Sequence, residues 1–420
     1  MRVNLQMRFH SYLNSTIQIL NEYKGEERFA LFLKKYFSQL KKYGSKDRKQ
    51  IGHLCYCFFR LGKSAPRFPP QWGGFEERML IGLFLCSVEP NEILEQLKPE
   101  WNKQINLATE RKLLIINYSI LIENVFPWKE ELSDGIDHEK FCESFFKQPD
   151  LFLRLRPKYE IVVKEKLSNA ELSFKEINSS CLALPNNSKV ESIIELDREA
   201  VIQDYNSQRV GEFLKSAIQN LIPMTIGTEI KLWDCCAGSG GKSLLLHDIH
   251  RNVDLTVSDI RESILANLKK RFAKAGIKKY KSFVTDLTSN QRLRPIESSG
   301  RLIAGDYDLI ICDAPCTGSG TWSRTPEQLY FFDENPPAGQ AGKIGQYSLL
   351  QKRIASNIIP YLKENGFLVY ITCSVFKKEN EEVANYLRDE FNLELTNMEL
   401  LKGYDKKADT MFVSLFKRNL

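Results

Sequence analysis

The spacing of hydrophobic positions changes along the chain and divides it into three parts. Apolar residues recur at helical spacing from residue 1 to about 145, which predicts a helical domain. Short alternating runs, such as the one at 151–156, mix with helix-like runs from 146 to 225, which predicts a small mixed α/β module. From 226 to 420 strand-like and helix-like runs alternate. We therefore expect three domains.

The alternation in the third part is typical of an α/β fold with a doubly wound, mostly parallel sheet. The predicted strands are 230–234, 254–258, 281–285, 307–312, 366–372 and 412–417, and the predicted helices are 242–250, 261–275, 347–362 and 379–390. Ligands bind at the carboxyl ends of the strands in such a sheet. Polar residues that directly follow these strands are therefore the first candidates for a functional site.

Composition indicates a globular protein without membrane segments. Of the 420 residues, 43% are apolar and 27% are charged. No apolar run reaches the roughly 18 residues of a membrane span, and no secretory signal is recognised, so we expect a cytoplasmic protein and a monomer. Ten cysteines without a Cys-x-x-Cys pair, with only five histidines, predict neither a disulfide scaffold nor a metal site.

The net charge of +6 is modest, but the basic residues are clustered. One cluster lies between residues 34 and 49, and another lies between 269 and 281. Such clusters suit a phosphate backbone, although for either cluster taken alone a solvated helix face is the stronger explanation. RNA is therefore a candidate partner, but the basic clusters alone do not establish it, and a further sequence feature is needed to favour RNA binding.

The first strand of the third part ends at an acidic residue and runs into a glycine-rich loop. Glycines allow the backbone to approach a ligand closely, and the start of the following helix offers free N–H groups to an anion. The spacing fits neither a P-loop nor the dinucleotide fingerprint. The candidate cofactor-binding residues here are Asp234, Cys236, Ala237, Gly238, Ser239, Gly240, Gly241 and Lys242.

Acidic residues also end the next two predicted strands. Asp259 ends the second strand, where an acid typically binds ribose hydroxyls, and Arg261 follows it closely. Asp286 ends the third strand, where it could meet an adenine amino group. Each acid could instead cap a helix. Three acids in register after one glycine loop favour a nucleoside cofactor.

Two cysteines carry the chemistry that the sequence suggests. Cys316 lies in the run from Asp313 to Gly320, and Cys373 lies between Thr372 and Ser374. Both follow strand-like runs, so both thiols are expected at the carboxyl ends of strands, facing the cofactor loop. Thiolates are strong nucleophiles, and this arrangement suggests covalent catalysis on a weakly reactive substrate.

Four segments of the chain resemble the Sun/RsmB family of S-adenosylmethionine-dependent RNA cytosine-5 methyltransferases. They are Asp234–Lys242, Asp313–Gly320, Thr372–Ser374 with Glu379–Glu381, and Ile202–Gln208. The resemblance covers about residues 145–420, while the first part is more weakly similar to the NusB-like domain of bacterial ribosomal RNA members. It implies a Rossmann-like class I methyltransferase core, S-adenosylmethionine as cofactor and RNA as partner, with ribosomal RNA favoured and tRNA possible.

The resemblance also implies roles for the site residues. Cys373 would add to carbon 6 of cytosine and Cys316 would assist its release, although the opposite assignment stays open. Asp313 would hydrogen-bond the cytosine ring and border the cofactor. Lys242 would contact either the methionine carboxylate or Asp313, and Asp234 would meet the methionine amino end or fix the loop.

Two other functions stay open beside this interpretation. The chain could methylate a tRNA cytosine, or it could be a non-catalytic ribosome-assembly factor on the same fold. Residues 333–345 are expected to form a mobile loop that either closes over the substrate or merely connects two elements.

Overall fold

The protein forms two compact units. The computed structural model describes residues 2–40, 42–64, 74–117, 122–225, 227–289, 306–334 and 340–419. One unit comprises Met1–Gln148 with Thr321–Asp333, and the other comprises Pro149–Gly320 with Glu334–Leu420. No described helix combines the length and the apolar character that crossing a bilayer requires.

The first unit is helical, as its apolar spacing predicts. Its N-terminal helices are α1 (Arg2–Glu22), α2 (Phe29–Gln39), α3 (Ser45–Arg60), α4 (Gly74–Cys86), α5 (Glu92–Leu97), α6 (Pro99–Asn102), α7 (Thr109–Ile115) and α8 (His138–Ser144). Helices α3 and α4 approach closely because Gly82 lacks a side chain; a Cβ there would lie 2.2 Å from the carbonyl oxygen of Cys57. Helix α7 ends at Ile115, and a short 3-10 helix follows at Ile122–Val125.

A short helix from the second half of the sequence belongs to this helical unit. Helix α13 (Pro326–Phe331) follows the Cys316 segment along the chain. Glu327 accepts a hydrogen bond from the backbone N–H of Phe29, and the ring of Phe331 packs edge-on against Tyr23 at 5.3 Å. The sequence interpretation placed these residues in the third part and did not foresee this packing.

The second unit begins with a small antiparallel sheet. Its strands are β1 (Leu151–Leu155), β2 (Lys175–Asn178), β3 (Cys181–Leu184) and β4 (Ala200–Ile202), in the order β2-β3-β1-β4. Helix α9 (Glu160–Asn169) packs on it through Val163 and Leu167. The strand predicted at 151–156 is confirmed. The division of the chain at 145 and 225 stays a prediction.

A seven-stranded sheet forms the centre of this unit. Its strands are β5 (Ile230–Asp234), β6 (Val253–Asp259), β7 (Lys281–Val284), β8 (Tyr307–Asp313), β9 (Leu362–Thr372), β10 (Leu393–Leu401) and β11 (Met411–Arg418). The order is β10-β11-β9-β8-β5-β6-β7, and β11 runs antiparallel to both of its neighbours. The remaining pairs are parallel. The predicted α/β fold with a mostly parallel sheet is confirmed.

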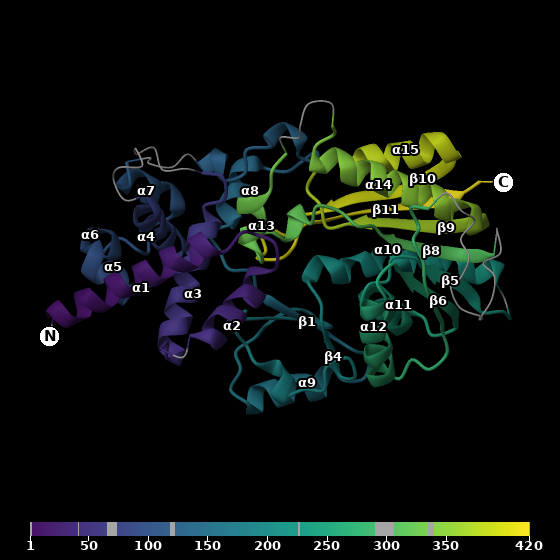
Figure 1. Ribbon diagram of the computed structural model, residues 1–420. Coiled ribbons are helices and arrows are strands. Elements are labelled where there is room, and N and C mark those ends of the chain that lie inside the picture. Colours follow the sequence, from purple (N-terminus) through teal and green to yellow (C-terminus); the bar gives the residue numbers. More distant parts are fainter. Residues whose placement is uncertain are drawn as a thin grey trace. The chain divides into compact units, whose positions relative to one another are not determined.

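Helices cover both faces of this sheet (Figure 1). One face packs against α10 (Tyr205–Leu221), α11 (Gly241–Ile249) and α12 (Glu262–Ala275). The other face packs against α14 (Lys343–Ile358) and α15 (Glu381–Phe391). Alternate residues of each strand point to opposite faces, and the helices on both sides bury them. The ends of the strands are not covered in this way, so polar residues there are available to form a site.

Some predicted elements are displaced or lie outside the described part of the chain. Helix α14 begins at Lys343 and ends at Ile358, four residues earlier at each end than the predicted helix 347–362. Neither α10 nor β10 was predicted. Residues 335–339, within the loop expected at 333–345, lie outside the described residues.

Candidate active site

The glycine loop after β5 has the backbone conformation that its glycines allow. Gly238 has φ +53° and Gly240 has φ +84°, both in the left-handed region. A Cβ at Gly240 would lie 2.7 Å from the ring of Phe272, so this position requires glycine for space as well as conformation. Helix α11 begins immediately afterwards, at Gly241. Its first N–H groups therefore lie at the end of the loop.

Asp234, the last residue of β5, is fully buried behind this loop. One carboxylate oxygen, Oδ2, accepts a hydrogen bond of 2.6 Å from the hydroxyl of Ser243. The other, Oδ1, is buried and has no hydrogen-bond partner among the described residues. Burial raises the pKa of Asp234 to about 7. A buried acceptor of this kind suits a cationic ligand group.

Asp259 braces the same loop from the end of β6. Its Oδ2 accepts the backbone N–H of Gly238 at 3.0 Å, and its Oδ1 accepts the backbone N–H and the Nε–H of Arg261. Asp286, after β7, accepts the backbone N–H and the hydroxyl of Thr288, which forms a local turn. The alternative role of helix cap is not the one observed among the described residues, since α12 has Arg261 at its N-cap position without a side-chain capping bond. Asp259 instead supports the glycine loop, and Asp286 stabilises a turn.

The thiols of Cys316 and Cys373 lie 3.3 Å apart. Cys316 follows β8 and Cys373 follows β9, which are neighbouring parallel strands. Two backbone hydrogen bonds join their loops, because the N–H of Ala314 donates to Ile371 and the N–H of Gly320 donates to Cys373, both at 2.9 Å. The structure therefore brings together the two thiols that the sequence singled out.

The surroundings of Cys316 make ionisation of its thiol unfavourable. Its hydrogen bond to Cys373 and its burial raise the pKa of the Cys316 thiol well above the ordinary value. Cys316 therefore keeps its proton near neutral pH. Either sulfur can be the donor in the hydrogen bond between the two thiols.

Lys242 and Asp313 form an ion pair beside the thiols. Lys242 Nζ lies 2.8 Å from Asp313 Oδ2, and the lysine side chain is only 9% exposed. Burial opposes the lysine charge, but attraction to Asp313 and then to Cys373 outweighs it and raises the pKa of Lys242. Lys242 therefore stays charged and contributes positive potential near the Cys373 sulfur. The pair joins the first turn of α11 to the end of β8.

Glu379 connects the two cysteine loops, although in the sequence it is only part of a segment that resembles the family. Its Oε1 accepts the hydroxyls of Thr317 and Ser374 at 2.7 and 2.9 Å. Its Oε2 accepts the backbone N–H of Thr317 at 2.8 Å and the amide of Gln351 at 3.1 Å. Thr317 and Ser374 each follow one of the two thiols directly. Glu379 therefore fixes the backbone beside both cysteines.

A third contact supports the glycine loop from the side of the small sheet. The guanidinium of Arg271, on α12, donates two hydrogen bonds of 3.0 Å to the carbonyl and hydroxyl oxygens of Ser239. Asp197, which precedes β4, pairs with the same guanidinium at 2.8 Å. Arg271 belongs to the basic cluster at 269–281, so part of that cluster serves the cofactor loop rather than a surface.

The sheet order, the glycine loop after β5 and the ends of β8 and β9 together define the class I methyltransferase fold. The solved structure of PH0851 is similar over 92% of this chain and 94% of its own, with a TM-score of 0.61 and 16% identity. A methyltransferase homolog from Pyrococcus horikoshii is similar over 75% of this chain and 100% of its own, with a TM-score of 0.50 and 20% identity. At these identities the similarity concerns the fold.

Residues 224–416, a little under half of the chain, match the family model described as 16S rRNA methyltransferase RsmB/F. The resemblance found in the sequence is thereby confirmed. Ribosomal RNA small subunit methyltransferase B of Proteus mirabilis is 30% identical over 187 residues, which are 44% of this chain and 38% of that protein. The match therefore spans less than half the length of this relative.

Proposed function

We propose that the protein transfers a methyl group from S-adenosylmethionine to carbon 5 of a cytosine in RNA, with ribosomal RNA as the favoured substrate. The observation that carries the proposal is the thiol pair of Cys316 and Cys373, 3.3 Å apart, at strand ends beside a glycine loop. A methyltransferase acting on a protein would need neither thiol. The RsmB/F match and the name of the Proteus relative support the choice of RNA.

The residues around the loop fit S-adenosylmethionine. The free Oδ1 of Asp234 would accept from the methionine ammonium, and burial of that oxygen would make the contact strong. A Cβ at Gly238 or Gly241 would meet no atom within 4 Å, so the loop has open space on that side. The bound cofactor would supply an electrophilic methyl group. The remaining candidates, Asp259 and Asp286, would border its nucleoside through the lone pairs they have left.

In the proposed mechanism Cys373 is the nucleophile. Its thiolate adds to carbon 6 of the cytosine, which removes the ring's aromaticity and makes carbon 5 able to take the methyl group. Lys242 stabilises the thiolate before attack. Asp313, whose carboxylate is held by Lys242, accepts a hydrogen bond from the exocyclic amino group of the cytosine and so positions the ring for attack.

Cys316 assists the second half of the reaction. After methyl transfer the carbon 5 proton must leave and the bond from carbon 6 to Cys373 must break. After the Cys373 sulfur is bonded to carbon, the Cys316 thiol loses its proton to solvent. The resulting Cys316 thiolate accepts the proton from carbon 5, the double bond between carbons 5 and 6 re-forms, and Cys373 leaves carbon 6 as a thiolate.

Two further parts of the proposal concern RNA binding. The helical N-terminal domain and the small module at 146–225 would hold the RNA by phosphate and shape contacts, aided by exposed lysines such as Lys269 and Lys274 on α12. The target base must leave its stack to reach the thiols, so a flipped or single-stranded cytosine is expected. A cytosine in tRNA is the second candidate substrate.

The test traps the covalent intermediate. Cys316→Ala protein is mixed with total cellular RNA and S-adenosylmethionine, and any denaturant-resistant protein–RNA adduct is isolated and its RNA sequenced. An adduct with Cys316→Ala that is absent from Cys373→Ala supports the assignment and identifies the substrate. An adduct only with Cys373→Ala reverses the thiol roles. No adduct from either variant, although both bind S-adenosylmethionine, favours a non-catalytic assembly factor.

A further inference from the structure

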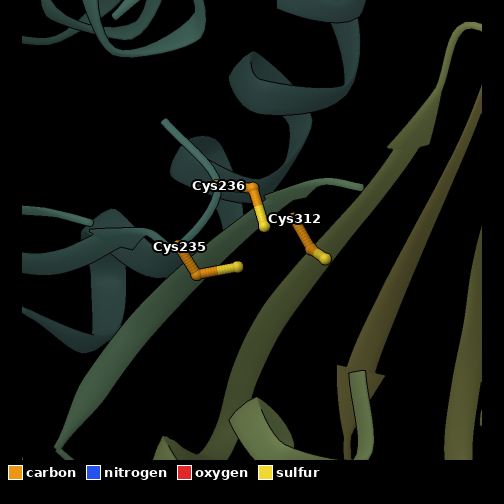
Figure 2. A group of neighbouring side chains, drawn as sticks. All are labelled: Cys235, Cys236 and Cys312. Atoms are coloured by element: carbon orange, nitrogen blue, oxygen red, sulfur yellow. The ribbon is translucent and has the colours of Figure 1, made fainter. Parts of the chain in front are cut away.

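Three cysteine thiols gather at a second place in the methyltransferase unit, apart from the catalytic pair. Cys235 and Cys236 follow β5 directly, and Cys312 is the penultimate residue of β8. Their sulfur atoms all lie within 4.8 Å of one another. Figure 2 shows the three side chains grouped where the two strands end. The proposed methyl transfer uses none of these thiols.

Strand register explains why the thiols meet. Trp233 lies opposite Ile310 and Asp234 opposite Ile311 in the parallel pair, and the N–H of Cys235 extends this ladder by donating to Ile311 at 2.9 Å. Cys235 is therefore level with Cys312 on the adjacent strand. Alternation places both side chains on the same face, in the apolar cluster formed with α14 and α15. The turn after β5 adds Cys236 beside them.

We propose that Cys235, Cys236 and Cys312 form a binding site for a thiophilic divalent cation of the zinc class. Three sulfur donors, with no imidazole in the group, are the ligand set that soft and borderline metal ions prefer. Zinc–sulfur bonds of about 2.3 Å in tetrahedral geometry place sulfurs about 3.8 Å apart. Sulfurs already within 4.8 Å need only small side-chain rotations to reach this geometry.

Charge and access favour a divalent cation over a monovalent one. Cys235 and Cys312 are 1% and 0% exposed, so three thiolates there would carry a buried charge that needs compensation. A divalent ion leaves one negative charge, whereas a monovalent ion such as Cu⁺ leaves two. Cys236 is partly exposed and gives the ion an entry path and a fourth position open to water.

Metal binding would displace the thiol protons to solvent, because a thiolate rather than a thiol is the metal ligand. Because Cys236 begins the glycine loop and Cys312 precedes Asp313, the ion would tie that loop to β8.

The test is a titration of the reduced, metal-free full-length protein. Co²⁺ is added as a spectroscopic probe, and Zn²⁺ is then added to displace it. We expect one Co²⁺ to bind per chain with thiolate-to-cobalt charge-transfer absorption, and one Zn²⁺ to remove that absorption. Cys236→Ser and Cys312→Ser should each weaken Zn²⁺ binding by about tenfold or more. Since Cys312 is buried, the partly exposed Cys236 is the variant expected to keep the fold.

Two controls separate this site from other thiols. Cys86→Ser replaces a partly exposed cysteine of the helical unit, and the double variant Cys316→Ala/Cys373→Ala removes the catalytic pair. Both should bind the ions as the unaltered protein does. Absence of the charge-transfer absorption, loss of it in the double variant but not in Cys236→Ser, or binding of Cu⁺ without Zn²⁺ would each overturn the proposal. The measurement needs no methyl transfer, so it stands or fails independently of the proposed function.

Discussion

Replacing Glu379 by alanine should loosen both cysteine loops at once. The change removes the acceptor for four donors, two on Thr317 and one each on Ser374 and Gln351. The two hydroxyls can find other partners in this polar cluster, whereas the Thr317 backbone N–H and the Gln351 amide proton cannot. Each unsatisfied buried donor costs about 1–3 kcal/mol. With the void left by the side chain, we expect a loss of about 3–5 kcal/mol in unfolding free energy.

Glutamine at the same position provides the internal comparison. Its amide oxygen can still accept from the Thr317 backbone N–H and from Gln351, and its NH₂ can donate to the two hydroxyls. Hydrogen bonds to a neutral oxygen are weaker than those to a carboxylate by roughly 1 kcal/mol each, but the cost of burying the charge also disappears. We therefore expect Glu379→Gln to lose only about 1 kcal/mol.

Two measurements check this difference. Denaturant unfolding at pH 8 gives the stability of each variant, and backbone hydrogen exchange of residues 314–320 reports the Cys316 loop directly. Exchange there should accelerate strongly in Glu379→Ala and weakly in Glu379→Gln. Glu382→Ala, an exposed glutamate on α15, serves as a matched control and should change neither measurement. If Glu379→Ala is as mild as the control, water replaces the carboxylate and the proposed bracing role is wrong.

Three further outcomes follow from the same geometry. Burial raises the pKa of Glu379 above its ordinary 4.5, so the native state binds a proton more tightly than the unfolded state does. The unfolding free energy should therefore fall as pH rises through the pKa of the folded state. In unfolding experiments at pH 4.5–8, Glu379→Gln should show a smaller decrease of unfolding free energy with pH. Arg271→Ala should weaken S-adenosylmethionine binding about tenfold in calorimetry without RNA, because Arg271 hydrogen-bonds Ser239 of the glycine loop. The exposed neighbour Lys270 has no such contact among the described residues, and Lys270→Ala should leave binding unchanged. Gly240→Ala should lower unfolding free energy by about 1–3 kcal/mol, because the new methyl group meets Phe272 and a left-handed φ disfavours alanine; an unchanged melting temperature would contradict this.

The sheet was predictable from the sequence because most of its strands are buried on both faces. Such strands are continuous apolar runs that end at a polar residue, and β5 begins and ends at the predicted residues. Strand β10 gave no such signal, since most of its residues between Leu393 and Leu401 are exposed or half-buried at the edge of the sheet. Helix α10 does have a recognisable signal in the sequence. Its buried residues Val210, Phe213 and Leu214 recur at helical spacing, which predicts a helix there.

The site was predictable where its residues share a local motif and unpredictable where they do not. The glycine loop and the two thiols lie in short sequence motifs, and each motif indicates its chemistry without knowledge of the fold. The proximity of Cys312 to Cys235 depends on how β8 aligns with β5, which no local pattern encodes. The expectation of no metal site stays a prediction; it rests on spacing along the chain, which does not measure distance across a sheet. The same limit explains why Glu379 carried no role: its partners come from three separate segments.

The protonation of the thiol pair bears on which cysteine attacks. Both sulfurs follow neighbouring strands and both face the same site, so position alone does not distinguish them. The pKa of the Cys316 thiol is raised by its hydrogen bond to Cys373 and by burial, and Lys242 places positive charge near the Cys373 sulfur. Both features favour the proposed assignment, in which Cys373 attacks and Cys316 keeps its proton until the methyl group has been transferred. A covalent adduct formed only with Cys373→Ala would reverse that assignment.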